Sequence, residues 1–195
     1  MNMLVDSVPE SLTIAGTEYK INTDYRIWLK FESLLSDESQ NSEVTLLDIK
    51  KLIFKSELPH DSDDEETTEQ ILLFYRCGKP EQKGGKSSKQ IFDYDYDDGY
   101  ICAAFIEQYN IDIETTKMHW WKFHALMLSL SENTEFVKIL GYRTIEITSK
   151  MPAAQKAFYQ KMKNHYKLPV KKEEQQRINA IEDALINGEP IDNLL

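Results

Sequence analysis

The sequence predicts a mainly α-helical fold: a helical bundle of about seven to eight helices with a short N-terminal β-hairpin. Apolar residues recur every three or four positions over most of the chain, which is the spacing of a helix that buries one face. Strand-like segments do not alternate with the helical ones, so a parallel α/β sheet is not expected. Hydrophobic residues make up 41% of the chain, which is enough for a folded core.

The N-terminal residues predict the hairpin and the first helix. The segment SLTIAGTEYKIN, residues 11–22, alternates apolar and polar side chains around an expected turn at Gly16 and Thr17. The spacing then becomes helical, and any of the polar residues 22–24 can cap the helix. The apolar positions of this helix are Ile27, Trp28, Phe31, Leu34 and Leu35.

Two more helices and a loop are expected next. Thr45 is the expected cap of the second helix, which carries Leu46, Ile49 and Ile53 and stops at Pro59. The acidic run HDSDDEETTE begins the third helix, because the positive end of the helix dipole favours negative charge. This third helix carries Ile71, Leu72 and Tyr75. Residues 78–92 lack apolar periodicity and are rich in Gly, Lys and Ser, so they predict a flexible surface loop.

Two near-motifs beside this loop fail on spacing. In GGKSS, a phosphate-binding loop would need Gly where the chain has Pro80, and Gly78 lies two residues too early. In DYDYDDG, a calcium loop would need Gly where Asp98 stands and a bidentate Glu where Ala104 stands. We therefore predict no nucleotide or metal site and no cofactor. The acidic run is expected to begin a helix that extends from about Asp95 to Tyr109.

No pattern of residues indicates an enzyme. The four histidines, His60, His119, His124 and His165, form no HExxH motif, and no GxSxG sequence is present. Cys77 and Cys102 lack the spacing of a metal or redox motif and are interpreted as two buried thiols in a reducing compartment. Nothing selects an acid–base pair among the 33 carboxylates.

The segment ETTKMHWWKFHALMLSL, residues 114–130, is the most apolar helix expected in the chain. It has two adjacent apolar stripes, one of Trp120, Phe123, Met127 and Leu130 and one of Trp121, Ala125 and Leu128. Two stripes predict a helix that is buried on most of its circumference or one that offers a face to a partner. Periodicity alone leaves both interpretations open.

Three further helices complete the predicted fold. A short helix over about 132–140 is expected to end at Gly141 in the left-handed conformation. Pro152 begins the next, with Ala154, Phe158, Met162 and Tyr166 in register, and Pro169 ends it. The last helix contains Ile178, Ile181 and Leu185. The predicted domains are a helical domain over residues 1–150 and a C-terminal helical appendage over residues 151–195.

The charge distribution argues against two classes of partner. A net charge of −10 disfavours nucleic acid and anionic membranes, since both are polyanionic. Residues 57–70 contain seven acids and no Lys or Arg, whereas residues 150–172 contain seven Lys and no acid. These runs are either solvated faces or complementary surfaces for self-association or for steering a charged helical partner. No signal peptide or membrane-spanning run is visible, so a cytoplasmic protein is expected.

Three neighbouring segments together resemble a bacteriophage family named for gene product fifteen. They are the acidic-aromatic run DYDYDDG, the segment YICAAFIEQYNIDI and the segment MHWWKFHAL. That family belongs to the tail modules of long-tailed phages and prophages of Gram-positive bacteria, and the matching block runs from about Asp93 to Leu130. Asn110 stands where the family pattern leads us to expect Gly, and Asn also tolerates the left-handed end of a helix.

The resemblance implies a tail assembly chaperone without catalytic residues. Such a protein binds the helical tape-measure protein and keeps it soluble in the host cytoplasm while tail-tube subunits polymerise; it is absent from the virion. The tail-tube protein is a further expected partner. The alternative is a structural tail, connector or tail-completion protein that remains in the particle. The predicted partner-binding residues, which either support or line an apolar groove, are Trp120, Trp121, Phe123, Met127, Phe158 and Met162.

Overall fold

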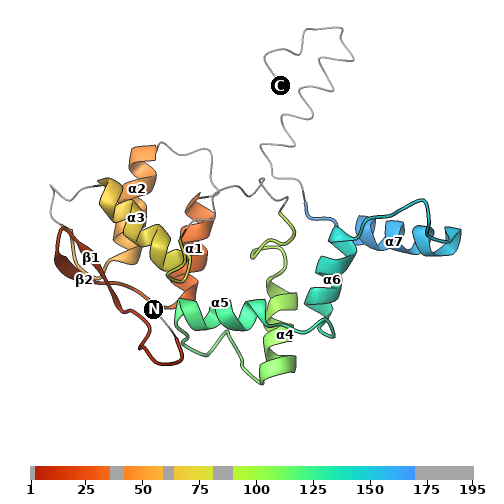
Figure 1. Ribbon diagram of the computed structural model, residues 1–195, viewed down its shortest axis with the longest axis horizontal. Helices are drawn as coiled ribbons and strands as arrows, with labels where there is room; N and C mark the ends of the chain where they lie inside the picture. The colour runs from red at the N-terminus through yellow and green to blue at the C-terminus, as the bar shows by residue number, and fades with distance from the viewer. Residues whose placement is uncertain (1–2, 36–41, 59–63, 81–89, 170–195) are drawn as a thin grey trace, which may run out of the picture. The chain divides into compact units, whose positions relative to one another are not determined.

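The computed structural model describes residues 3–35, 42–58, 64–80 and 90–169 (Figure 1). Within these residues it contains one two-stranded hairpin and seven helices, so the predicted mainly α fold with an N-terminal hairpin is confirmed. The predicted last helix and most of the predicted 78–92 loop lie outside the described residues. The elements are β1 (Ser11–Ile14), β2 (Thr17–Lys20), α1 (Tyr25–Leu35), α2 (Ser42–Ile53), α3 (Asp64–Tyr75), α4 (Asp98–Tyr109), α5 (Trp120–Leu128), α6 (Glu135–Thr144) and α7 (Ala153–His165).

The hairpin turns one residue earlier than predicted. Ile14 pairs with Thr17, so the two loop residues are Ala15 and Gly16, not Gly16 and Thr17. Both have positive φ, +48° and +76°, as a tight turn between twisted strands requires. The Ala15 N–H donates to both carboxylate oxygens of Glu66 in α3, at 3.1 Å each. The hairpin therefore leans on α3, which supplies the support that two strands alone lack.

The first helices differ from the prediction mainly at their ends. Asp24 caps α1, because its Oδ1 accepts the Arg26 N–H at 3.1 Å. The buried face of α1 is Tyr25, Trp28 and Phe31, whereas Leu35 is exposed and was wrongly placed on it. Helix α2 begins at Ser42, so Thr45 lies inside the helix and is not its cap.

Helix α4 begins later than predicted and ends as predicted. It starts at Asp98 rather than near Asp95, because the preceding residues form turns in which Asp93 Oδ1 accepts the N–H groups of Asp95 and Tyr96 at 2.9 and 3.0 Å. Asn110 ends the helix in the left-handed conformation, with φ 52° and ψ 37°. This confirms that Asn takes the place of a C-terminal glycine here.

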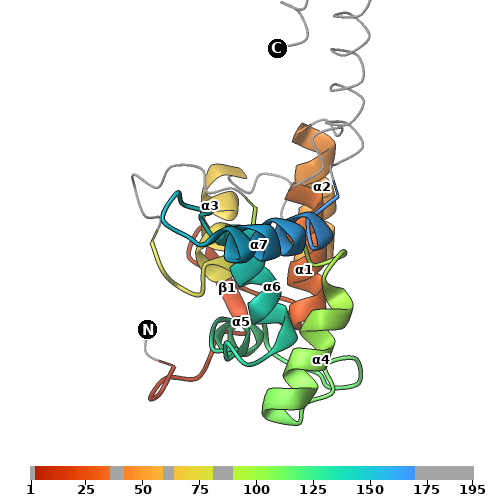
Figure 2. The same cartoon turned by 90° about the vertical axis from the view of Figure 1, so that its right-hand side faces the viewer.

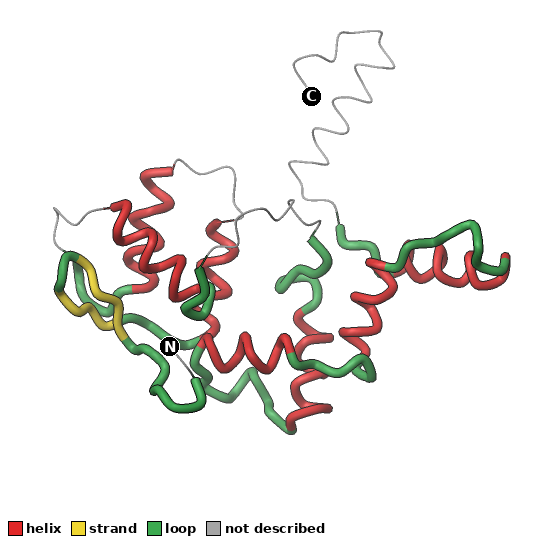
Figure 3. The backbone as a smooth tube through the Cα atoms, viewed as in Figure 1, coloured by secondary structure: helices red, strands yellow, loops and turns green. Residues whose placement is uncertain are grey.

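Helix α5 is much shorter than the predicted 114–130 segment, and a long loop precedes it (Figure 3). Residues 117–120 instead run beside residues 23–25 in extended pairing. The Tyr25 N–H donates to Met118 O at 2.9 Å, and the Trp120 N–H donates to Thr23 O at 2.7 Å. These long-range bonds hold the backbone extended up to His119, so the helix can begin only at Trp120.

The last two described helices also depart from the prediction. Helix α6 continues through Gly141 to Thr144, and Gly141 is not left-handed, so the predicted stop was wrong. Pro152 caps α7 as expected for a helix start, and the helix ends at His165 before Pro169 is reached. Figure 2 faces α6 and α7 directly, and Figure 1 shows the C-terminal ends of these two helices next to each other.

The chain divides into two compact units. The first contains the described residues of 3–80 and 97–138, and the second contains 90–96 and 139–169. In the first unit α1 packs against α2 and α5, and α3 packs against β1. The division lies within α6, whereas the predicted domain boundary at 150/151 stays a prediction. No helix of the described residues is long and apolar enough to span a bilayer.

Candidate partner-binding surface

Four of the predicted partner-binding residues lie inside the first unit. Trp120, Trp121 and Phe123 are at most 3% exposed, and Met127 is also buried. The second predicted stripe of α5 is not buried beyond Trp121, because Ala125 is exposed and Leu128 is 70% exposed. The helix therefore has one buried face and one solvent face. These four side chains can support a binding surface, and their role toward a partner stays a prediction.

The buried face of α5 joins a continuous aromatic core. Phe123 stacks between Tyr25 of α1 and Phe105 of α4, with ring centroids 4.4 and 5.3 Å apart. Trp120 stacks on Tyr75 at 5.4 Å, nearly parallel to it. Stacked aromatic pairs contribute roughly 0.5–1.5 kcal/mol beyond the area they bury. The core therefore connects α1, α3, α4 and α5.

The two adjacent tryptophans bind two adjacent carbonyls at the end of α3. The Trp121 indole N–H donates to Phe74 O and the Trp120 indole N–H donates to Tyr75 O, both at 2.8 Å. The last carbonyls of a helix have no partner within the helix and need donors from elsewhere. The Trp-Trp pair supplies two such donors while both rings stay buried. The two consecutive tryptophans therefore have a structural role at the end of α3.

The chain makes a tight turn directly after α3, and this turn packs against the Trp121 ring. Cys77 and Gly78 have φ of 55° and 73°, and the Gly78 N–H donates to Leu73 O at 2.9 Å, as in a Schellman end. A Cβ at Gly78 would lie 3.1 Å from the Trp121 ring. Gly78 thus belongs to the end of α3, and its placement in the predicted 78–92 loop was wrong. It allows Trp121 to pack against the backbone.

His119 links the start of α5 to the N-terminal segment. Its Nδ1 accepts the Trp121 N–H at 3.1 Å and caps the helix, while its Nε2 lies 3.0 Å from Pro9 O. The acceptor role of Nδ1 places the ring proton on Nε2. Burial lowers the His119 pKa, although the Pro9 carbonyl and Glu10 act in the opposite direction. The imidazole is therefore neutral in the folded protein at neutral pH.

This geometry predicts a loss of stability at mildly acidic pH. The unfolded chain binds a proton at His119 near pH 6.5, whereas the folded chain binds it only at lower pH. The contribution of His119 to the free energy of unfolding is therefore complete above pH 6.5 and falls as the pH drops below it. Burial and Lys79 lower the His124 pKa in the same direction. His119→Asn keeps a capping oxygen but does not titrate. Urea midpoints at pH 7.5 and 5.5 should differ less for His119→Asn than for the wild type, and an equal difference would contradict this role.

Arg26 fastens the loop before α5. Its guanidinium pairs with Asp24 at 3.1 Å and donates through Nη2 to the carbonyls of Ile113, Glu114 and Thr116 at 2.7–3.2 Å. The neighbouring Tyr25 hydroxyl donates to Ile113 O as well, at 2.7 Å. A loop without secondary structure of its own has many carbonyls to satisfy, and one arginine satisfies three of them. Sequence periodicity gave no signal for this residue.

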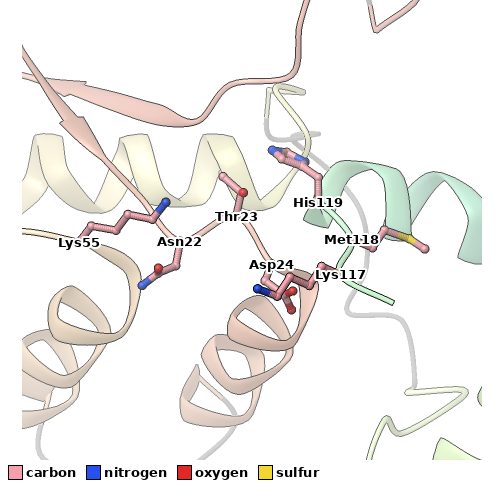
Figure 4. Close-up of a pocket in the computed structure, with 7 residues that line it drawn as sticks. All are labelled: Asn22, Thr23, Asp24, Lys55, Lys117, Met118 and His119. Atoms are coloured by element: carbon pink, nitrogen blue, oxygen red, sulfur yellow. The ribbon is translucent and has the colours of Figure 1, made fainter. Parts of the chain in front are cut away.

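An open pocket of about 270 Å³ lies at the junction of β2, α1, α2 and the segment before α5 (Figure 4). Several of its polar groups already bind neighbouring elements: Asn22 Nδ2 donates to Leu52 O at 3.0 Å, and Asp24 pairs with Arg26. The pocket is therefore best explained as a structural junction. Its lining residues are Asn22, Thr23, Asp24, Lys55, Lys117, Met118 and His119.

Neither cysteine carries an activated thiol. Burial raises the pKa of the Cys77 thiol to about 11, and burial together with Asp98 raises that of Cys102, so both thiols are protonated at neutral pH. Both cysteines are free, and both are half-buried, so the expectation that they are fully buried was wrong. Among the described residues, no group of three or more His, Cys, Asp and Glu side chains could hold a metal ion.

The other two predicted residues lie on α7 in the second unit. Phe158 is 48% exposed, and Met162 is half-buried. No residue of α7 is fully buried, in contrast to α1, α3, α4 and α5. Phe158 is thus the member of the predicted set that can meet another protein directly. Other large apolar side chains that are exposed in the first unit include Leu47, Ile106 and Leu128.

Comparison with known proteins identifies one family. The profile of the family described as bacteriophage Gp15 protein matches residues 4–168. This match spans most of the chain, including both units of the described structure. Searches of curated proteins and of solved structures gave no significant match.

Proposed function

Because the chain belongs to the bacteriophage Gp15 protein family, we propose that it is a tail assembly chaperone, which binds the phage tape-measure protein and keeps it soluble while the tail tube forms. The observation that carries the proposal is the family match over residues 4–168. In the proposed role the protein works by binding alone, without catalysis or a cofactor. It acts in the cytoplasm of the bacterial host and is not retained in the mature virion.

The physical properties of the chain suit this role. A long helical partner with exposed apolar stripes aggregates unless another surface covers them. A chaperone needs exposed apolar side chains for that contact, and Ile106 and Phe158 are such side chains. It also needs enough charge to keep the complex dispersed, and this chain has a net charge of −10.

The rigid core supports the proposal in a different way. A binding surface keeps its shape when the elements beneath it are fixed by packing and hydrogen bonds. The Trp120 and Trp121 bonds to the end of α3, together with the Phe123 stack, fix α5 against α1, α3 and α4. In this proposal these buried residues act as supports, and exposed apolar side chains make the contacts.

Co-purification tests the proposal. The chain, carrying an affinity tag, is co-expressed with the tape-measure protein of the same phage and with no other tail protein. We expect the tape-measure protein to elute with the tagged chain. A tagged, unrelated acidic helical protein is the control, because it matches the charge but not the surface. If the tape-measure protein elutes with neither protein, or equally with both, the proposal is wrong.

Mass spectrometry of purified particles separates the proposal from the virion alternative. A chaperone that leaves before completion should be present far below one copy per particle. A connector or tail-completion protein should be present in a fixed number of copies. Stoichiometric recovery of this chain from washed particles would therefore favour the structural alternative.

A further inference from the structure

Helix α7 is held in the second unit mainly by one side. The residues of that side are half-buried and recur every three or four positions: Lys156, Tyr159, Met162, Lys163 and Tyr166. The two lysines donate to backbone carbonyls, Lys156 to Ser149 O at 3.0 Å and Lys163 to Ile145 O at 2.7 Å. Met162 therefore belongs to the packed side of the helix and not to its solvent face.

The C-terminal end of α7 is fixed to α6. The Arg143 Nε–H donates to Tyr166 O at 2.6 Å, and the rings of Tyr142 and Tyr166 stack at 5.8 Å. Arg143 also donates to Ile91 O at 3.1 Å, which brings residues 90–96 into the same unit. These contacts position the helix without involving Ala154, Ala157 or Lys161.

The opposite face of α7 is apolar at one end and basic at the other. Ala154, Ala157, Phe158 and Lys161 are exposed and lie at helical spacing along one side. Alanines permit another helix to approach closely, because interaxial distances depend on the side chains at the contact. Phe158 stands beside them and is 48% exposed, although its ring meets those of Tyr142 and Tyr159 edge to face, with centroids 6.2 and 5.3 Å apart. This face has the features of a helix-docking surface.

The charged side chains of the α7 segment have one sign. Residues 150–169 contain Lys150, Lys156, Lys161, Lys163 and Lys167 and no Asp or Glu. This local excess of positive charge attracts acidic groups, although the chain as a whole has a net charge of −10. A partner that meets α7 is therefore complementary if apolar residues alternate with carboxylates on its contact face.

We propose that the exposed face of α7 binds an acidic amphipathic helix of the partner protein, with its apolar side chains against Ala154, Ala157 and Phe158 and its carboxylates against Lys161. This inference rests on the proposed function, and it assigns the contact to the second unit of the chain. The mode is that of helix recognition by apolar anchors at spacings of three and four. Phe158 is the central anchor, and the lysines set orientation and speed of association.

A paired substitution tests this surface. Phe158→Ala with Lys161→Glu alters the α7 face. As the control, Leu128→Ala with Lys122→Glu likewise removes one exposed apolar side chain and reverses one exposed charge, on α5. Full-length chains are co-expressed with the tape-measure protein, and the amount retained per tagged chain is measured. We expect the α7 pair to retain about tenfold less than the wild type, which corresponds to the loss of one binding anchor. The α5 pair should retain as much as the wild type.

Each other outcome overturns the inference in a distinguishable way. Equal retention by the wild type and the α7 pair means that the partner binds elsewhere, and the proposed function stands. If none of the chains retains the tape-measure protein, both this inference and the proposed function are wrong. Loss of retention after nuclease treatment, or a change in the sedimentation of the chain alone caused by the α7 pair, assigns this face to nucleic acid or to a second copy instead.

Carbodiimide cross-linking of the complex provides a readout that does not depend on the variants. This reagent joins an amine to a carboxylate in direct contact and leaves no spacer. We expect Lys161 to be linked to Asp or Glu residues of the tape-measure protein that lie three or four positions apart. Links from Lys122 of equal yield, or none from Lys161, would contradict the proposed chemistry.

Discussion

Replacement of Trp121 by alanine is expected to lower the free energy of unfolding by about 3–5 kcal/mol, the usual cost of removing a buried tryptophan. Trp121 is 3% exposed, its indole N–H donates to Phe74 O, and its ring covers Gly78. The change leaves a cavity beside α3 and removes one of the two indole donors from the end of that helix. Urea denaturation followed by far-UV circular dichroism measures the loss.

Two further substitutions show whether this explanation is right. Trp121→Phe keeps a ring but removes the donor, and should cost about 1 kcal/mol for the hydrogen bond because Phe74 O still receives the Cys77 N–H. Leu128→Ala, at a 70% exposed position of the same helix, should change stability little. If Trp121→Ala folds with wild-type stability and yet loses the tape-measure protein, Trp121 is a contact residue and the core interpretation is wrong.

Replacement of Arg26 by alanine is the second large expected effect, a loss of about 2–3 kcal/mol, since bonds from a charged donor are worth more than neutral ones. The variant leaves the carbonyls of Ile113, Glu114 and Thr116 without their shared donor and Asp24 without its cation. Because the loop also positions Met118 and His119, hydrogen exchange should increase across residues 111–120.

Arg26→Lys is the matched control for this prediction. A lysine keeps the charge beside Asp24 but has no planar fork to reach three carbonyls. We expect it to recover less than half of the stability lost in Arg26→Ala. Full recovery would mean that the ion pair with Asp24, rather than the loop carbonyls, accounts for the role of Arg26.

The positions of the helices could be predicted from sequence wherever local apolar spacing and end residues determine them. The apolar spacing around Trp28, Ile71 and Phe105 indicates real helices, and the left-handed end at Asn110 follows from the known tolerance of Asn for that conformation. The start of α5 was not predictable, because residues 117–120 are held extended by bonds to residues nearly a hundred positions away. Gly141 was misleading for a related reason: glycine permits a helix to end but does not require it.

The candidate site was predictable only in part. The spacing of Trp120, Phe123 and Met127 correctly indicated one buried stripe. It could not show that Trp121 is buried while Leu128 is exposed, because that depends on where α3 and Gly78 lie. Arg26 acts through loop carbonyls distant in sequence, and no periodicity reveals such a role. The solvent face of α7 likewise follows from which of its residues pack on α6.

The Trp-Trp pair connects the family resemblance to the fold. Two tryptophans in succession on a helix point to different sides, and a single apolar stripe would need only one of them. Here each binds a different carbonyl of α3, so the pair closes the end of one helix while it starts another. The Trp-Trp motif therefore has a structural explanation that does not require a ligand site.

The most direct test of the proposed chaperone role is the fraction of tape-measure protein that remains in the supernatant after high-speed centrifugation, when it is synthesised with and without this chain and with no other tail protein. The proposal predicts that the tape-measure protein sediments when made alone and stays soluble, bound to this chain, when the two are made together. A tape-measure protein that is equally soluble in both cases, or that sediments in both, would contradict it.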